Sequence, residues 1–142
     1  MEAGTEIRDR GSEVSRPRDP ASPESCGAVR QRPPTDRSGV THKVTLGEPP
    51  EPRVDFYITL NRYPDGRPCE VFTKAGGGLQ GWCDAICRLM SVLLQHGVPL
   101  ETICGQLLRS HFAPCGMVPG FGFARSFADY LARWVGQGMK NG

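Results

Sequence analysis

The sequence lacks the features that would assign it at once to a membrane, secreted or nucleic-acid-binding class. No apolar run reaches the roughly 18 to 20 residues that a membrane-spanning helix needs, and the start MEAGTEIRDR has no apolar segment of a secretory signal. The formal net charge is only +2, too small for a strong polyanion-binding surface. We therefore expect a cytoplasmic protein that binds neither membrane nor nucleic acid.

Aromatic residues are missing from the first third of the chain, where Phe56 is the first of them. Residues 1–40 are instead rich in proline, serine and charges of both signs. Such a segment cannot bury enough apolar surface to offset backbone ordering, which costs roughly 1 to 2 kcal/mol per residue. We predict a disordered arm over residues 1–40 and one folded domain over residues 41–140. Without a secretion signal, the six cysteines are expected to be reduced thiols.

The first part of the predicted domain has the patterns of an antiparallel sheet. Three segments show strand features: 42–46, 56–60 and 68–73. Pro64-Asp65-Gly66 supplies a fixed φ, a turn-forming carboxylate and a glycine free to adopt positive φ, so the last two strands form a hairpin. The pattern leaves open whether Val71 or Phe72 faces the core.

The second part has the spacing of helices, over residues 79–96, 99–108 and 126–136. The apolar stripe of the first helix consists of Leu79, Trp82, Cys83, Ile86, Leu89, Met90, Leu93 and Leu94. Gly97 suits a left-handed helix end, and Pro99 suits the first position of the next helix. Ser126 and Asp129 have the spacing of a capping box. These patterns predict an α+β domain, in which a small antiparallel sheet of about three strands is followed by about three helices on one face.

Five side chains could in principle supply the four ligands of a zinc ion: Cys83, Cys87, Cys104, His111 and Cys115. However, the sequence has no tight pair of the C-x-x-C kind among them, and Cys83 and Cys104 lie within apolar stripes. Cysteine in such a stripe behaves as a small hydrophobic residue. We predict that these thiols pack in the core and that there is no metal site; a zinc-stabilised structural module is the alternative.

The histidines and carboxylates show no arrangement typical of a catalytic centre. His42, His96 and His111 have no serine or cysteine partner at a spacing typical of nucleophilic catalysis. A strand-edge position explains His42, and the dipole at a helix C-terminus explains His96. Asp84 and Asp129 are expected to be surface or capping groups. We predict no catalytic residue.

A glycine run leads from the third predicted strand into the first predicted helix. Lys74 with Gly76, Gly77 and Gly78 could bind an anion or a nucleotide phosphate, because free N–H groups and the positive dipole end gather at a helix N-terminus. The run matches neither G-x-x-x-x-G-K-[ST] nor G-x-G-x-x-G. A strand-to-helix turn also needs glycine for purely conformational reasons, so both interpretations stand.

Four blocks, at Arg32–Lys43, Asp65–Phe72, Leu93–Glu101 and Ala124–Trp134, carry a resemblance to a known family. They read RPPTDRSGVTHK, DGRPCEVF, LLQHGVPLE and ARSFADYLARW. Together they resemble the TSCPD domain, which is found near the C-terminus of adenosylcobalamin-dependent, class II ribonucleotide reductases.

The resemblance implies a role in deoxyribonucleotide synthesis, as a split-off piece or an accessory module of a class II ribonucleoside-diphosphate reductase. A large reductase chain and a nucleotide are the implied partners, with Tyr63, Asp65 and Arg67 at the hairpin tip as candidate contacts. In the large reductases, the reactive cysteines and the cobalamin site belong to a barrel domain without a counterpart here. No cofactor and no turnover are therefore expected from this chain alone. A stand-alone nucleotide-sensing module is the alternative.

Overall fold

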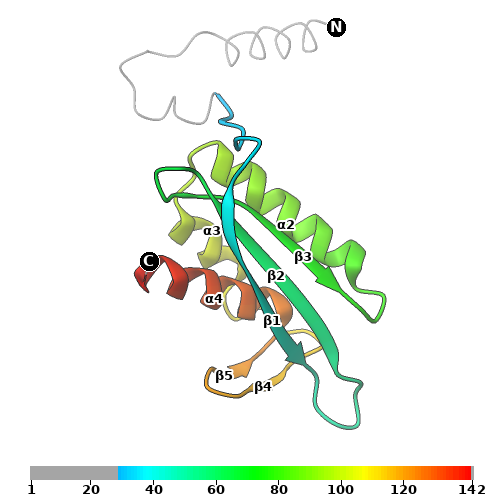
Figure 1. The fold of residues 1–142 in the computed structure, drawn as a ribbon. Coiled ribbons are helices and arrows are strands. Elements are labelled where there is room, and N and C mark those ends of the chain that lie inside the picture. Colours follow the sequence, from blue (N-terminus) through cyan, green and yellow to red (C-terminus); the bar gives the residue numbers. More distant parts are fainter. Residues whose placement is uncertain (1–28, 142) are drawn as a thin grey trace, which may run out of the picture.

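The computed structural model describes residues 29–141, with side chains up to residue 137. The disordered arm predicted for residues 1–40 falls mainly outside this range. The elements are β1 (Ser38–Leu46), β2 (Val54–Arg62), β3 (Pro68–Ala75), α2 (Gln80–Gln95), α3 (Leu100–Leu107), β4 (Gly116–Val118), β5 (Gly122–Ala124) and α4 (Phe127–Asn141). Figure 1 shows this succession of a sheet, helices and a short hairpin.

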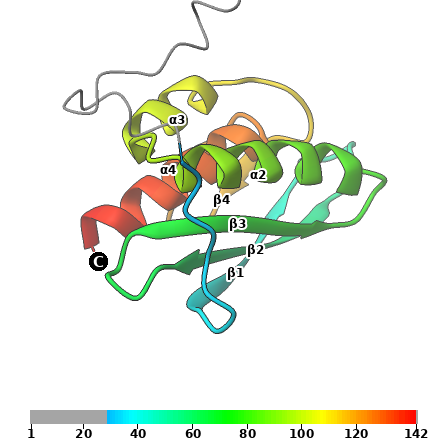
Figure 2. The same cartoon turned by 90° about the horizontal axis from the view of Figure 1, so that it is seen from above.

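The described part of the chain forms two layers. The strands β1, β2 and β3 make an antiparallel sheet in that order, and β4 pairs with β5 in a separate hairpin. The helices α2, α3 and α4 all lie on one face of the three-stranded sheet, as Figure 2 shows from above. This arrangement confirms the predicted α+β class.

The register of the sheet decides which side chains enter the core. In β2, Phe56 and Ile58 are fully buried, and Leu60 beside them pairs with Val71 of β3. Val71 is therefore the inward residue, with 1% of its surface exposed, whereas Phe72 is 52% exposed on the open face. The alternation inside a strand permits only one of the two residues to face the helices.

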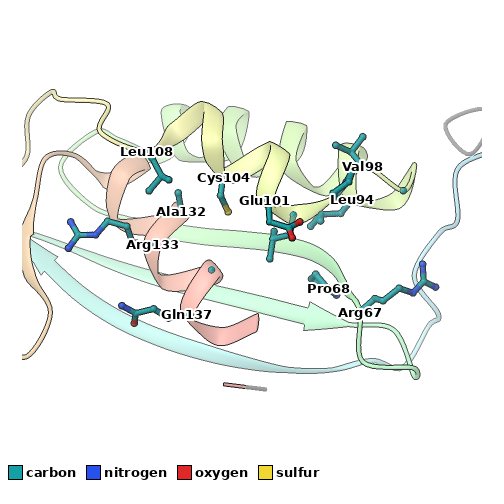
Figure 3. A pocket seen from close by; sticks show the side chains of 14 residues that line it. Arg67, Pro68, Leu94, Val98, Glu101, Cys104, Leu108, Ala132, Arg133 and Gln137 are labelled. Atoms are coloured by element: carbon teal, nitrogen blue, oxygen red, sulfur yellow. The ribbon is translucent and has the colours of Figure 1, made fainter. Parts of the chain in front are cut away.

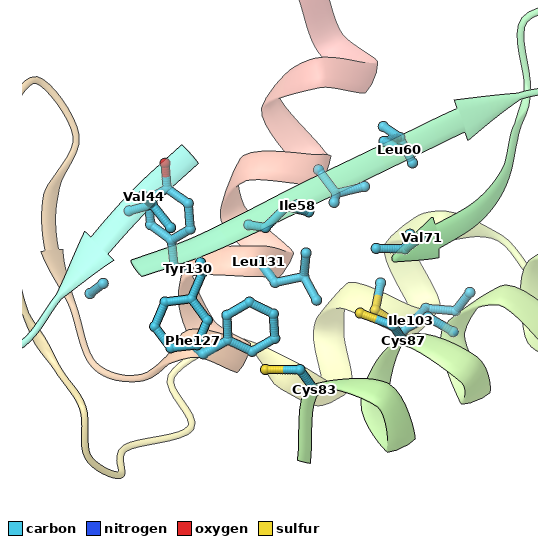
Figure 4. Close-up of a cluster of buried hydrophobic side chains, with 14 of the residues drawn as sticks. Val44, Ile58, Leu60, Val71, Cys83, Cys87, Ile103, Phe127, Tyr130 and Leu131 are labelled. Carbon is cyan, nitrogen blue, oxygen red and sulfur yellow. The ribbon is translucent and has the colours of Figure 1, made fainter. Parts of the chain in front are cut away.

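An apolar cluster joins the sheet to the helices, as Figure 4 shows. Its members from the sheet include Val44, Ile58 and Val71, and α4 contributes Phe127 and Leu131. Removing such an aliphatic or aromatic side chain from water contributes about 1.5 to 3 kcal/mol to folding. This cluster fixes how the helices sit on the sheet.

The buried stripe of α2 is narrower than the sequence predicts. Trp82, Leu89 and Leu93 belong to the predicted stripe, but they are 59%, 67% and 41% exposed. The helix meets the sheet along the line that contains Cys83 and Met90, and the other three residues lie on a neighbouring line that no element covers fully. Hydrophobic spacing alone therefore overestimated the width of the contact.

The helix ends follow local sequence signals, with two corrections. Gly97 has a φ of 86° after α2, and the Ser126 hydroxyl accepts a hydrogen bond from the Asp129 N–H at 3.0 Å, so both predicted caps are present. Pro99 is the N-cap of α3 rather than its first helical residue. The third helix continues past Gly136, where the sequence predicted its end. A glycine inside a helix costs only about 1 kcal/mol, which the packing of α4 can offset.

The segment FAPCGMVPGFGF, between the second and third predicted helices, contains the β4–β5 hairpin. Gly120 turns this hairpin with a φ of 76°, and the Met117 N–H donates to the Glu48 carboxylate at 2.9 Å. The hairpin is thereby attached to the loop between β1 and β2. No helix in the described range is both long enough and apolar enough to cross a bilayer.

Candidate partner-binding site

A groove of about 810 Å³ lies between α3, α4 and the start of β3. We call it the α3–α4 groove, and Figure 3 shows its lining. The lining residues are Arg67, Pro68, Leu94, Gly97, Val98, Pro99, Leu100, Glu101, Cys104, Leu108, Ala132, Arg133, Gly136 and Gln137. Most of these residues are apolar, which is typical of a ligand or partner site.

Local sequence explains why the groove is open. The turn through Gly97 and Pro99 redirects the chain from α2 into α3, so α3 packs against α4. On α4, the groove is lined by Ala132 and Gly136, whose small side chains leave space between the two helices. No local sequence pattern indicates this site, because its lining comes from α3, α4 and the start of β3, which are far apart in the sequence.

Three charged residues belong to the groove lining, and hydrogen bonds within the protein hold two of them, Arg67 and Arg133, in place. Figure 3 shows Arg67 and Arg133 at opposite ends of the groove, with Glu101 between them. Arg133 donates to the Phe123 carbonyl at 2.6 Å and to the Asp129 carboxylate at 3.2 Å. The groove therefore offers an apolar floor with cations at both ends and a carboxylate on its rim.

Asp129 is the group that orders this end of the molecule. Its carboxylate is 1% exposed and accepts hydrogen bonds from the backbone N–H groups of Arg109 at 2.7 Å and Arg125 at 3.1 Å, besides the bond from Arg133. Burial by itself would raise the pKa of Asp129, but these donors stabilise the charged form and the net pKa lies below its ordinary value. The predicted capping residue thus also positions a groove arginine.

The hairpin tip, residues 63–67, holds the three predicted partner contacts together. The Arg67 side chain donates to the Asp65 carboxylate at 2.8 Å and lies 4.6 Å from the centre of the Tyr63 ring. Hydrogen bonds from Arg67 lower the pKa of Asp65. Tyr63 is only 4% exposed, so Asp65 and Arg67 form the accessible part of the tip.

Residues upstream of β1 support this tip, although no sequence pattern indicated them. The Tyr63 hydroxyl donates to the Gln31 carbonyl at 2.5 Å, and Arg67 donates to the Gln31 side chain at 3.1 Å. Arg37 pairs with Glu70, which is 4% exposed, and this contact raises the pKa of Arg37. These partners are about 30 residues apart in sequence, so no local pattern indicates them.

The structure does not bring Lys74 and the glycine loop, residues 76–78, to one face. Lys74 pairs with Tyr57 on the open side of the sheet, whereas α2 begins on the other side. Gly77 and Gly78 have φ values of 65° and 77°, which explains two of the glycines by conformation. Anion or nucleotide binding by Lys74 and the glycines stays a prediction.

The buried thiols behave as the core-packing interpretation predicts. Cys83, Cys87 and Cys104 are 2%, 3% and 6% exposed, and burial raises the pKa of Cys83 to about 12 and that of Cys87 to about 11. Within residues 29–137, no three histidine, cysteine or acidic side chains come close enough together to hold a metal ion. His111 contacts Phe123 edge-on at 6.3 Å rather than the thiols.

His42 lies on the edge strand β1, as predicted, and faces α4. Its Nε2 is 2.6 Å from the Tyr130 hydroxyl, and its ring stacks on Trp134 at 5.0 Å between centres. Burial lowers the pKa of His42. The ring is thus used in packing β1 onto α4.

The described residues form a small α+β domain with an apolar groove between α3 and α4. The sequence profile of the TSCPD domain matches residues 22–139, and the chain belongs to this family. No solved structure matches the chain.

The similar curated proteins are vitamin B12-dependent ribonucleotide reductases. The protein from Rhodopirellula baltica is 35% identical over 112 residues, which are 75% of this chain and 10% of that protein. The protein from Streptomyces avermitilis is 40% identical over 110 residues, or 74% of this chain and 11% of that protein. The protein from Bradyrhizobium diazoefficiens is 31% identical over 110 residues, or 73% and 8%. The chain therefore spans about a tenth of the length of these relatives.

The name of these relatives raises the question of a B12 cofactor on this chain. The α3–α4 groove has the size of a site for a drug-sized molecule, and a corrinoid coenzyme is much larger. The groove lining includes no imidazole, and the Nε2 of His42 is already bonded to Tyr130. The groove does not fit this coenzyme, and we derive no chemistry from it.

Proposed function

We propose that this chain is a TSCPD module that docks onto the catalytic part of a vitamin B12-dependent ribonucleotide reductase and serves deoxyribonucleotide synthesis as a split-off piece or an accessory module. The observation that carries the proposal is the identity of 35% to 40% over 110 to 112 residues with a segment of such reductases. In those proteins the segment is joined to the remaining nine tenths of the polypeptide.

The hairpin tip and the α3–α4 groove are the surfaces that we assign to this contact. Arg67 belongs to both of them, since it pairs with Asp65 at the tip and lines the groove. Arginine is enriched among the few interface residues that supply most of the binding energy, and these residues tend to lie in well-packed apolar surroundings. The exposed carboxylate of Glu101 adds a charge that a partner can read.

The test uses the Streptomyces avermitilis reductase, from which the 110 residues matched by this chain are deleted. The purified deletion protein is mixed with this chain, and binding is followed by calorimetry and ribonucleotide reduction by product analysis. We expect binding and recovery of activity. A deletion protein that is fully active without any added chain, or one that never binds it, would refute the proposal.

Two controls locate the contact. Arg67→Ala should weaken binding at least about tenfold, whereas Arg88→Ala, on the exposed part of α2, should leave it unchanged. The chain alone, with adenosylcobalamin, a reductant and a ribonucleotide, should form no deoxyribonucleotide. Turnover by the isolated chain would contradict a purely accessory role.

A further inference from the structure

The two edges of the three-stranded sheet are treated differently, and the β3 edge is closed by α2. Gln95 donates to the Cys69 carbonyl at 2.9 Å, and the Ser91 hydroxyl bonds both the N–H and the carbonyl of Val71, at 2.9 and 3.2 Å. Gln80 bonds the Thr73 carbonyl at 2.7 Å and the Ala75 N–H at 2.8 Å. Side chains of a helix therefore occupy the positions that a further strand would need.

In the described part of the chain, the β1 edge has no such side-chain bonds along it, although the short strand β4 lies close to β1. Gly76 donates to the Asp55 carbonyl at 3.4 Å, so the odd-numbered residues of β2 bond β3 and the even-numbered ones bond β1. The outward N–H and C=O groups of β1 consequently belong to Gly39, Thr41, Lys43 and Thr45. Within residues 29–141, no hydrogen bond reaches these groups from another strand, a helix or a loop.

The usual devices that protect an edge strand are also missing from β1. Its nine residues pair with β2 in unbroken register, so there is no bulge, and the strand contains no proline. Its lysine, Lys43, is drawn back over the sheet, where its Nζ lies 3.7 Å from the Asp55 carboxylate and 5.7 Å from the centre of the Tyr57 ring. The lysine thus leaves the edge accessible.

We propose that β1 is a self-association edge, at which a second copy of the chain adds its own β1 antiparallel to form a continuous six-stranded sheet. With the two-fold axis at His42, Gly39 pairs with Thr45 of the second copy and Thr41 with its Lys43. These are four pairs with two bonds each, or about eight backbone hydrogen bonds. This self-association needs no reductase and is independent of the proposed function.

The side chains of β1 favour this register over its neighbours. Val40, which is 59% exposed on the helix side of the sheet, comes opposite Val44 of the second copy and gains an apolar neighbour. A shift of two residues in one direction places Lys43 directly opposite its own symmetry mate, which repels. The opposite shift leaves Thr45 unpaired. In this register the strand matches its copy in hydrogen bonding and keeps the two Lys43 side chains from lying directly opposite each other.

The first test measures the oligomeric state by sedimentation equilibrium at pH 8, from micromolar to near-millimolar protein. The wild-type chain should dimerise reversibly. Thr41→Pro removes an outward N–H that the β1–β2 ladder does not use, so the monomer should stay folded while the dimer dissociation constant rises at least about tenfold. Thr41→Val is the matched control: both variants lose the Thr59 hydroxyl contact of 2.8 Å, but valine keeps the N–H and should dimerise.

The second test fixes the register and does not depend on the proline variant. In the proposed pairing, Thr41 and Lys43 of the other copy have Cα atoms about 5.5 Å apart, within disulfide range. The double variant Thr41→Cys, Lys43→Cys should oxidise to a reducible dimer, and each single variant should stay monomeric under denaturing electrophoresis. A mixture of the two single variants should form only the mixed dimer.

Three results would overturn the proposal. A wild-type chain that stays monomeric at all concentrations has no such interface. A Thr41→Pro protein that is folded and still dimerises uses another surface. Protection of the Thr41, Lys43 and Thr45 amides from hydrogen exchange in a monomeric sample would show that another part of the same chain covers the edge.

Discussion

Replacing Asp129 by asparagine tests how the end of the α3–α4 groove is ordered. The carboxylate accepts three hydrogen bonds from groups of the same chain, namely two backbone N–H groups and the Arg133 guanidinium. Asparagine has nearly the same volume, but one of its two terminal atoms is a donor and it carries no charge. The substitution therefore removes acceptors without opening a cavity.

The magnitude follows from the number of bonds lost. A hydrogen bond to a charged group contributes about 1.5 to 3 kcal/mol. Asparagine keeps one acceptor oxygen and therefore only part of the three bonds, so we expect the free energy of unfolding to fall by about 3 kcal/mol. With a urea m-value of about 1.5 kcal/mol/M, the unfolding midpoint should fall by about 2 M. Because a domain of this size is stable by about 5 to 15 kcal/mol, the variant should still fold.

The destabilisation caused by Asp129→Asn should also depend on pH in a defined direction. The folded pKa of Asp129 lies below the ordinary value of about 4, so its stabilising contribution is complete above that value and is lost as the pH falls toward the folded pKa. The difference in unfolding free energy between wild type and Asp129→Asn should therefore shrink between pH 6 and about pH 3. Urea titrations followed by tryptophan fluorescence would measure it.

Asp84→Asn is the matched control, because Asp84 is exposed on α2 and accepts one bond from Gln80 at 2.7 Å. Its loss should stay below about 0.5 kcal/mol at every pH. If Asp129→Asn cost no more than this control, or if its cost did not change with pH, the carboxylate would not be the ordering group described above.

Three further predictions concern other buried groups. Ser91→Ala should lower the free energy of unfolding in urea by about 1 to 3 kcal/mol, because it leaves the buried N–H of Val71 without a hydrogen-bond acceptor; a loss below 0.5 kcal/mol would contradict this bond. Stability should fall as the pH drops below about 6.5, through the lowered pKa of His42, and His42→Gln should flatten that part of the profile; an unchanged profile would contradict it. Iodoacetamide should leave Cys83, with its pKa of about 12, unmodified in the native protein while it labels the half-buried Cys115; equal labelling by peptide mass spectrometry would contradict the burial.

Local rules explain which parts of the fold the sequence revealed. Alternation in β1 and β2 and the cap at Gly97 each depend on a few adjacent residues, and the structure confirms them. The β4–β5 hairpin was missed because strands of three residues carry too little periodicity. Helical spacing also could not separate Trp82 from Cys83, since burial depends on which elements pack around the helix.

In the candidate site, too, local sequence predicts some features, whereas others depend on tertiary packing. The hairpin tip was placed from its turn sequence, and the structure brings Asp65 and Arg67 together there. The α3–α4 groove and the burial of Tyr63 depend on residues far apart in sequence, such as Gln31 and Arg133. Their positions follow from the tertiary packing, which no single-sequence pattern encodes.

The seal that α2 places on β3 has a consequence for how far strand pairing can proceed. Endless cross-β stacking requires two free margins on every subunit, one to receive a neighbour and one to pass the pattern on. Here five backbone groups on the β3 edge already form hydrogen bonds with glutamine and serine side chains of α2. Pairing through the β1 edge alone ends at a dimer. By covering the β3 edge, α2 therefore prevents the sheet from extending into a fibre.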